Sequence, residues 1–255
     1  MTGPAPPAGA PEDDAARLGN PSFVWRFGQE RRLAMMERYG ELDGLRVLDL
    51  GCGVGEYVRA FSRKGARAIG CDIAVDRLVE ARKRDETGSA NYLAGVGERL
   101  PFADASLDRI VLNEVIEHVQ DDRQTMEEIA RVLKPGGRCI VFAPNRLYPF
   151  ETHGIYLRKR YIFGNIPLVN WLPMPLRNRL VPHARVYQHG DWKRLARGLP
   201  LRIVDRTCVY AGYDNIAARA PRTASFLRRV SYWAEGNALR RFGLSHLVVY
   251  ERTDR

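Results

Sequence analysis

Short apolar runs alternate with amphipathic stretches along the middle of the chain. The run Val47-Leu48-Asp49-Leu50 leads into three closely spaced glycines, and an apolar-periodic stretch starts at Tyr57. This order is typical of a buried parallel strand, a tight turn and the start of a helix. The same alternation predicts strands over 46–50, 68–72, 91–95, 107–113 and 138–143, and helices over 56–64, 76–86 and 121–133. We therefore expect an α/β fold with helices on both faces of a mostly parallel sheet.

Further elements are expected on both sides of this region. Strands over 203–210 and 244–251, with a helix near 223–240 between them, would complete a seven-stranded sheet whose last strand is antiparallel. A helix over 23–40 is expected to form a lid, and Asp191 is expected to cap a short helix that ends near Gly198. Residues 1–20 are expected to be a disordered tail because they are rich in Pro, Ala and Gly. Residues 21–255 are expected to form one domain.

The glycine turn indicates the kind of ligand. Glu56 stands where a dinucleotide fingerprint has its third glycine, and its carboxylate would oppose a pyrophosphate. Asp49 precedes the turn Gly51–Gly55, so both acids suit a ligand that carries an ammonium group. Asp72 ends the second strand, where an acid accepts hydrogen bonds from ribose hydroxyls. An amino-acid end and a ribose without a diphosphate predict S-adenosylmethionine.

Six stretches in order and spacing carry a family resemblance. They are Val47–Gly55, Gly70–Asp72, Glu98–Phe102, Leu107–Asp108, Glu114–Val119 and Glu128–Gly137. In these the chain resembles class I S-adenosylmethionine-dependent methyltransferases of the ubiquinone/menaquinone-biosynthesis type (methyltransferase type 11). The resemblance covers roughly residues 44–145, the expected cofactor-binding core, and implies a Rossmann-like fold.

The resemblance also implies which residues hold the cofactor. Asp49 and the turn backbone would hold its methionine end, Asp72 its ribose, and Ile73 its adenine. Relatives usually have an Asp two residues before Glu98 for the adenine amino group, but here that position is Val96. Either the backbone and Glu98 replace this contact, or packing holds the adenine. The implied cofactor-binding residues are Asp49, Gly51, Cys52, Gly53, Asp72, Ile73, Gly97, Glu98 and Asn113.

The segment after the fourth strand is expected to lie beside the transferred methyl group. His118 is the candidate base or acceptor-pocket residue, because its ordinary pKa is near neutrality. Glu114, Glu117 and His118 share a face of a helical turn. They resemble the Glu-x-x-Glu-His metal site of quinone-pathway O-methyltransferases and small-RNA 3′-end methyltransferases, so a divalent metal such as Mg or Mn is one interpretation. In the other, Glu114 orders the cofactor and His118 shapes the pocket. Candidates for a fourth ligand are His153, His183 and His189.

Charge is distributed unevenly along the chain. Residues 1–145 carry a net charge of −3 and residues 146–255 carry +13. This surplus suits an anionic membrane surface, nucleic acid or an acidic substrate, or else a solvated arginine-rich surface. Segment 146–190 mixes apolar residues with arginines, and is interpreted as a substrate-recognition insertion, an interfacial surface or a packed lid. Within it, Glu151 and His153 are expected to face the acceptor. The basic amphipathic helix near 223–240 is expected to bind membrane or a partner, or to be half-buried.

The sequence predicts a methyltransferase for a small hydrophobic acceptor, with O-methylation favoured over C- or N-methylation. An RNA methyltransferase and a catalytically inactive cofactor-binding module remain alternatives. A dehydrogenase is disfavoured by Glu56 and by the lack of a Tyr-x-x-x-Lys pair. Widely spaced cysteines, the lack of a bilayer-spanning apolar run and the lack of a secretory signal favour the cytoplasm, with membrane association as a variant. The sequence does not indicate an oligomeric state.

Overall fold

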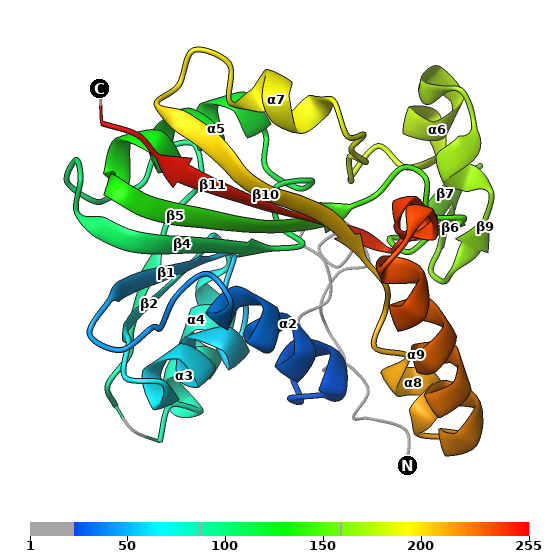
Figure 1. The fold of residues 1–255 in the computed structure, drawn as a ribbon, viewed down its shortest axis with the longest axis horizontal. Coiled ribbons are helices and arrows are strands. Elements are labelled where there is room, and N and C mark those ends of the chain that lie inside the picture. Colours follow the sequence, from blue (N-terminus) through cyan, green and yellow to red (C-terminus); the bar gives the residue numbers. More distant parts are fainter. Residues whose placement is uncertain (1–22, 87, 159, 255) are drawn as a thin grey trace.

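The computed structural model describes residues 23–86, 88–158 and 160–254, and its centre is a seven-stranded sheet between two layers of helices (Figure 1). The strand order is β10-β11-β5-β4-β1-β2-β3. The strands are β1 (Arg46–Leu50), β2 (Arg67–Asp72), β3 (Asn91–Ala94), β4 (Leu107–Asn113), β5 (Leu133–Pro144), β10 (Leu201–Val209) and β11 (Ser245–Arg252). Strands β1 to β5 are parallel, and β11 runs antiparallel between β5 and β10. The predicted fold class is confirmed.

Helices cover both faces of the sheet. One face carries α2 (Phe27–Glu37), α3 (Glu56–Arg63) and α4 (Val75–Lys83), and the other carries α5 (Asp122–Val132) and α7 (Asp191–Leu195). Side chains alternate across each strand, so Ile110 packs in the core under α5 while Val111 packs in the core under α3. The sheet is therefore buried on both sides, as its apolar runs predict. After β10 come α8 (Asp214–Ala217), α9 (Pro221–Glu235) and the 3₁₀ turn η2 (Ala238–Phe242).

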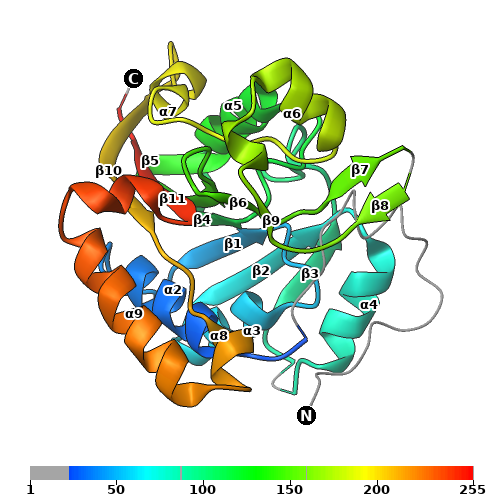
Figure 2. The same cartoon turned by 90° about the vertical axis from the view of Figure 1, so that its right-hand side faces the viewer.

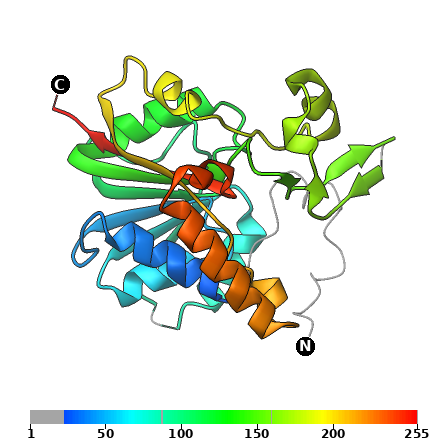
Figure 3. The same ribbon diagram turned by 45° about the vertical axis from the view of Figure 1, so that its right-hand side comes forward.

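A small subdomain follows β5, beyond the carboxyl ends of the parallel strands (Figures 1 and 3). Two two-stranded pairings organise it, β6 with β9 and β7 with β8. Its elements are β6 (Phe150–Glu151), β7 (Ile155–Leu157), β8 (Arg160–Ile162), β9 (Ile166–Pro167), η1 (Val169–Trp171) and α6 (Met174–Leu180). Val169, Val181 and Ala184 give it a core of its own. The carboxyl ends of parallel strands form the usual binding crevice of such sheets, and the subdomain lies over it.

Several predicted boundaries differ from the observed ones. Strands 46–50 and 107–113 have the predicted bounds, but β5 begins at Leu133 rather than at residue 138. The Pro-Gly-Gly that follows Lys134 is typical of a turn, so the sequence places the start of the strand after it. In the structure Leu133 already pairs with Leu107, and a register shift follows. Asp191 is the first residue of α7 and Gly190 is the cap, so the predicted cap is wrong by one position. The four short strands of the subdomain were not predicted. The expected tail lies outside the described residues.

Within the ranges that the structure describes, no helix has the length and apolar character that crossing a bilayer requires.

The glycine turn after β1 packs against the segment that follows β4, and this contact can be tested. Gly51 has φ of 75°, and a Cβ there would overlap the Val115 side chain. Gly44 has φ of 70° but no atom within 4 Å of its added Cβ. We expect Gly51→Ala to lower the free energy of unfolding by about 2–4 kcal/mol, and Gly44→Ala by about 1 kcal/mol from backbone strain alone. Urea unfolding of both variants measures the difference, and equal losses would contradict the predicted overlap.

Candidate active site

The turn between β1 and α3 is fixed to the neighbouring strand β2. The amides of Gly51 and Cys52 donate to the Cys71 carbonyl at 2.7 and 3.1 Å, and the Gly53 amide donates to the Asp72 carboxylate at 2.8 Å. Asp72 also accepts from the Ala74 amide at 2.9 Å. Each Asp72 oxygen therefore has one bond and retains a lone pair that can accept another. A preformed turn of this kind needs no reordering when a ligand binds.

Asp49 is a buried carboxylate without a local counter-charge. Its side chain is almost completely buried at the end of β1, and no donor or cation among the described residues contacts it. Burial, with the charge of Asp72 as a smaller cause, raises the pKa of Asp49 to about 8. A cationic ligand group would stabilise the carboxylate form. The site therefore fits a ligand that carries an ammonium or sulfonium charge.

Two apolar side chains are exposed beside these acids. Ile73, directly after β2, is 51% exposed, and Val96, after β3, is 38% exposed. Gly97 lies against Thr125, while Glu98 accepts from the amides of Gln120 and Asp121 at 2.7 and 3.1 Å. One Glu98 oxygen thus holds the loop before α5. Ile73 and Val96 offer the packing surface that a flat aromatic ring requires.

Glu114 and Asn113 face helix α2. Glu114 accepts from Arg32 at 2.7 Å and from the Ser245 hydroxyl at 2.5 Å, and Arg32 also donates to Asn113. Burial opposes ionisation of Glu114, but Arg32 and Ser245 outweigh it and the pKa is lowered. Glu114 also has φ of 58°, a left-handed conformation that non-glycine residues seldom adopt. That conformation turns Glu114 toward Arg32 rather than toward Glu117. Asn113 lines a small cavity of about 240 Å³ between α2 and the end of β4.

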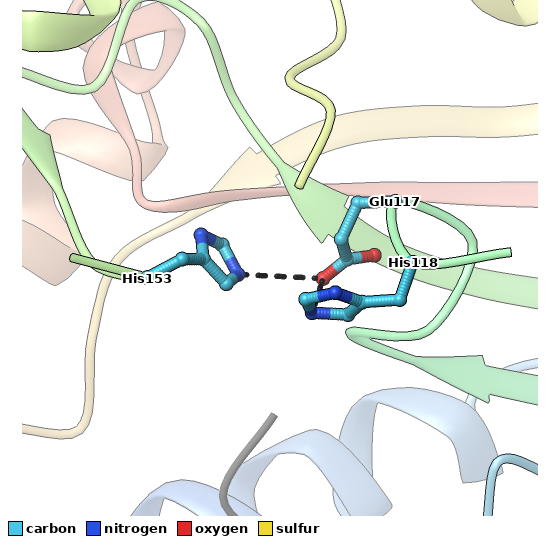
Figure 4. Close-up of side chains that lie close together, drawn as sticks. All are labelled: Glu117, His118 and His153. Atoms are coloured by element: carbon cyan, nitrogen blue, oxygen red, sulfur yellow. Dashed lines mark ion pairs between the residues drawn. The ribbon is translucent and has the colours of Figure 1, made fainter. Parts of the chain in front are cut away.

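Glu117, His118 and His153 converge from two segments (Figure 4). The first two follow β4, and His153 follows β6 in the subdomain. One Glu117 oxygen lies 3.7 Å from His153 Nε2 and 3.9 Å from His118 Nε2, and one ligand atom from each residue lies within 4.8 Å of the others. Neither Glu117 oxygen has a hydrogen-bond partner, although the residue is buried. An orphaned carboxylate facing two imidazoles is a donor set that fits a divalent metal.

A buried ion pair orients His153. Its Nδ1 lies 2.8 Å from Glu151, whose other oxygen accepts from Arg177 at 2.7 Å. Glu151 and Arg177 are both fully buried. Burial lowers the pKa of His153, but Glu117 and Glu151 outweigh it and raise that pKa to about 10. Burial raises the pKa of Glu117 to about 7.

His118 is held in one tautomer. Its Nδ1 lies 3.1 Å from the His183 carbonyl, and because a carbonyl only accepts, Nδ1 carries the proton. The lone pair is then on Nε2, on the side of Glu117. Burial and the charge of His153 lower the pKa of His118 to about 4, so the ring is neutral near pH 7. His118 and Glu117 also line a cavity of about 750 Å³ whose other wall includes Val181 and Tyr187.

Comparisons with known proteins identify the core of the chain. A family profile described as a methyltransferase domain matches residues 48–141. Residues 48–141 form a methyltransferase domain. The predicted resemblance is confirmed, and a domain of this family would bind S-adenosylmethionine over the turn and acids described above.

Individual relatives agree with this domain. A demethylmenaquinone methyltransferase of Beutenbergia cavernae is 32% identical over 156 residues, 59% of this chain and 64% of that protein. A ubiquinone biosynthesis O-methyltransferase of Mesorhizobium japonicum is 28% identical over 200 residues, 78% of this chain and 73% of that protein. A solved S-adenosylmethionine-dependent methyltransferase from Mesorhizobium loti has a TM-score of 0.61 at 20% identity, covering 88% and 97% of the two chains, which shows a common fold. The chain spans 64% of the length of the first curated relative.

The residues that the sequence predicted as a metal site do not all lie together, and one of them, His153, lies outside the methyltransferase domain. The structure brings His153 to Glu117 and His118, and places Glu114 at Arg32 instead. His183 contacts the group through its backbone and through His153, whose carbonyl lies 3.0 Å from His183 Nε2. His189 lies apart, against Arg206. Sequence reasoning missed Arg32 and Arg177, because nothing distinguishes them from the other arginines of their segments.

The pairing of His153 with two glutamates predicts its titration. In metal-free protein we expect His153 to stay protonated up to about pH 9. Its contribution to stability is complete below the unfolded-state pKa of about 6.5 and is lost as pH rises through about 10. NMR of the ring protons measures this pKa, and Glu151→Gln should lower it. His246, whose pKa burial lowers to about 4, is the internal control. A His153 that titrates near 6.5 would contradict the pairing.

Proposed function

We propose that the protein transfers a methyl group from S-adenosylmethionine to a hydroxyl oxygen of a small, hydrophobic, phenol-like acceptor. The observation that carries this proposal is the Asp49 carboxylate, which is buried beside a preformed glycine turn and contacts no cation in the part of the chain that the structure describes. The methyltransferase domain and the quinone-pathway names of the relatives support it. The Mesorhizobium japonicum relative, which aligns over 78% of this chain, is named an O-methyltransferase.

The donor would be held at the carboxyl ends of β1 and β2. Asp49 would face its positive amino-acid end, and Asp72 has lone pairs for ribose hydroxyls. Ile73 and Val96 would pack against the adenine, since the chain has no Asp at position 96. When bound, S-adenosylmethionine supplies an electrophilic methyl group on a sulfonium centre.

The acceptor proton would go to His118. Its Nε2 keeps a lone pair because Nδ1 donates to the His183 carbonyl, and His118 lines the larger cavity, where an acceptor ring would have room. As the acceptor oxygen bonds to the methyl group and the bond between that methyl group and the sulfur breaks, leaving a neutral thioether, the hydroxyl proton would pass to Nε2. Alignment of the acceptor oxygen supplies much of the acceleration of such a displacement, so the rigid setting of His118 matters as much as its basicity.

A divalent metal fits the group formed by Glu117, His118 and His153. Glu151 would hold the Nδ1 proton of His153 and so leave Nε2 free, the arrangement in which a carboxylate orients a histidine ligand. Two imidazoles and one carboxylate favour Mn or Zn over Mg. Bound there, a metal would lower the pKa of an acceptor hydroxyl, and His118 would then be a ligand rather than the base. Catalysis with and without added metal separates the two roles.

Donor binding gives the first test. We expect S-adenosylmethionine to bind with an affinity that rises with pH toward a plateau above about 8, because Asp49 must lose a proton. Asp49→Asn should weaken binding about tenfold or more and remove this pH dependence. Calorimetry in buffers of different ionisation enthalpy measures both effects. The surface acid variant Asp76→Asn is the matched control. Absence of binding to the unmodified protein would refute every enzymatic interpretation.

Metal binding gives the second test. We expect Mn²⁺ to bind one site per chain, and His153→Ala or Glu117→Gln to weaken that binding about tenfold or more. Titration followed by electron paramagnetic resonance measures free Mn²⁺ directly. His189→Ala changes a histidine outside the group and should leave binding unchanged. Turnover that persists in chelator, together with no Mn²⁺ binding, would exclude the metal and leave His118 as the base.

A further inference from the structure

We propose that the protein docks on an anionic lipid bilayer through two exposed apolar surfaces at the carboxyl end of the sheet. One is the α9 stripe, formed by Phe226, Val230 and Trp233. The other is the hairpin surface, formed by Leu157, Ile162, Phe163 and Leu168. The two surfaces contain the three most exposed large apolar side chains among the described residues, Trp233, Phe163 and Phe226.

The α9 stripe runs along one side of a four-turn helix. Phe226, Val230 and Trp233 are spaced i, i+4 and i+7, which places them on one face. Trp233 is 67% exposed and Phe226 is 64% exposed, whereas Ala224, Ser231 and Ala234 form the buried side. The helix thus buries its small residues and exposes its large ones. This is the reverse of the usual arrangement of a helix that only covers a core.

The hairpin surface has the same inverted character. Residues 155 and 162, and 157 and 160, are cross-strand partners, so Leu157 and Ile162 lie on one face of the hairpin. The opposite face carries Tyr156 and Tyr161, which pack against His183 in the subdomain. Phe163 follows the hairpin and is 65% exposed, and Leu168 is also exposed. The tyrosine face of the hairpin thus packs inward, while on the other face Leu157 and Ile162 are exposed and Ile155 packs on the subdomain core.

Arginines border both surfaces without acidic partners. Segment 146–190 has seven Lys and Arg and one acid, and segment 211–243 has six Arg and two acids. Each of these acids is used internally, Glu151 by Arg177, Asp214 by Arg228 and Glu235 by Arg31. The exposed arginines that have no acidic partner among the described residues include Arg158, Arg160, Arg222 and Arg229. Their charge is thus available to anionic headgroups.

The two surfaces belong to elements on one side of the molecule. Figure 2 looks onto the carboxyl ends of the parallel strands and shows α9 at one edge and the β7–β8 hairpin at the opposite edge. Figure 1 shows both projecting from that side, with the ends of the strands between them. A flat surface that approaches from this side meets both elements. The candidate site then opens toward the bilayer, which, if the proposed function holds, delivers a lipid-soluble acceptor to it.

The side chains favour a bilayer over nucleic acid. Single-stranded nucleic acid is held by aromatic rings on which bases stack. Here only Phe163, Phe226 and Trp233 are aromatic, and Val230, Leu157, Ile162 and Leu168 offer no stacking surface. Aliphatic and aromatic side chains bordered by arginines are the composition that enters the headgroup boundary of a membrane.

Vesicle sedimentation, without S-adenosylmethionine, tests the proposal. We expect the protein to bind vesicles that contain phosphatidylglycerol about tenfold or more tightly than vesicles of phosphatidylcholine alone, and less tightly as salt rises. The triple variant Phe226→Ser, Val230→Ser, Trp233→Ser and the charge variant Arg222→Glu, Arg229→Glu should each lose most of this binding. The matched control is Arg63→Glu, Arg67→Glu, which changes two exposed arginines at the other end of the sheet.

Brominated lipids test the geometry. We expect them to quench the fluorescence of Trp233 but not that of buried Trp192. The part of the quenching that is due to Trp233 is the part that the Trp233→Phe variant loses. Circular dichroism establishes that each variant is folded. Equal binding to both kinds of vesicle, or none, would overturn the proposal. The proposal would also be overturned if the same residues bound single-stranded RNA and the protein did not bind vesicles. It would likewise be overturned if the protein formed a dimer that the triple variant dissociates. Vesicle binding by a protein that does not bind S-adenosylmethionine would refute the proposed function and leave this inference standing.

Discussion

The candidate site depends on one ion pair that water does not reach. Glu151 and Arg177 join the start of the subdomain to its helix α6 at 2.7 Å, and both side chains are fully buried. Removing one member of such a pair leaves an unpaired buried charge and costs about 3–5 kcal/mol. The second Glu151 oxygen holds His153, and the second Arg177 nitrogen donates to the Ala184 carbonyl. The pair therefore determines where the subdomain presents its histidine to the core.

Two other buried carboxylates lack a bonded partner of this kind among the described residues, although Glu117 faces the His153 ring at 3.7 Å. Burial raises the pKa of both Asp49 and Glu117 into the range around neutrality, and each lies at the carboxyl end of one of two adjacent strands, β1 and β4. Such groups lower the stability of the empty protein to the extent that their burial is not compensated, which is only partly the case for Glu117 because His153 faces it. A cation restores the balance at each position. The two acids thus define two separate sites for positive charge, one on the glycine turn and one beside His118 and His153.

Prediction from the sequence succeeded for elements in which residues close in the chain are also close in the structure. The strands, the glycine turn and the alternation of helices are local patterns, and β1 and β4 have the predicted bounds. The candidate metal group was predicted from helical spacing after β4, but residue 114 adopts φ of 58° and points to Arg32, so the spacing does not apply. His153 takes the place of Glu114 because the fold of the subdomain returns it to the core. No local pattern encodes that return, nor the choice of Arg177 among seven basic residues of the segment.

The positive charge of the C-terminal half also has a structural explanation. The acids of the subdomain and of the α8–α9 region, Glu151, Asp214 and Glu235, each form an ion pair with an arginine. The other arginines of these regions therefore leave a net positive charge on the surface. The β7–β8 hairpin joins this surface to the chemistry. It follows His153 directly, its inner tyrosines pack on His183, and the Tyr161 hydroxyl donates to the His153 carbonyl at 2.6 Å. Its outer face carries the exposed Leu157 and Ile162. The hairpin that carries the exposed side chains is therefore also the element whose Tyr161 contacts the backbone of His153. One short element thus contributes both to the outward-facing surface and to the surroundings of the histidine that faces Glu117.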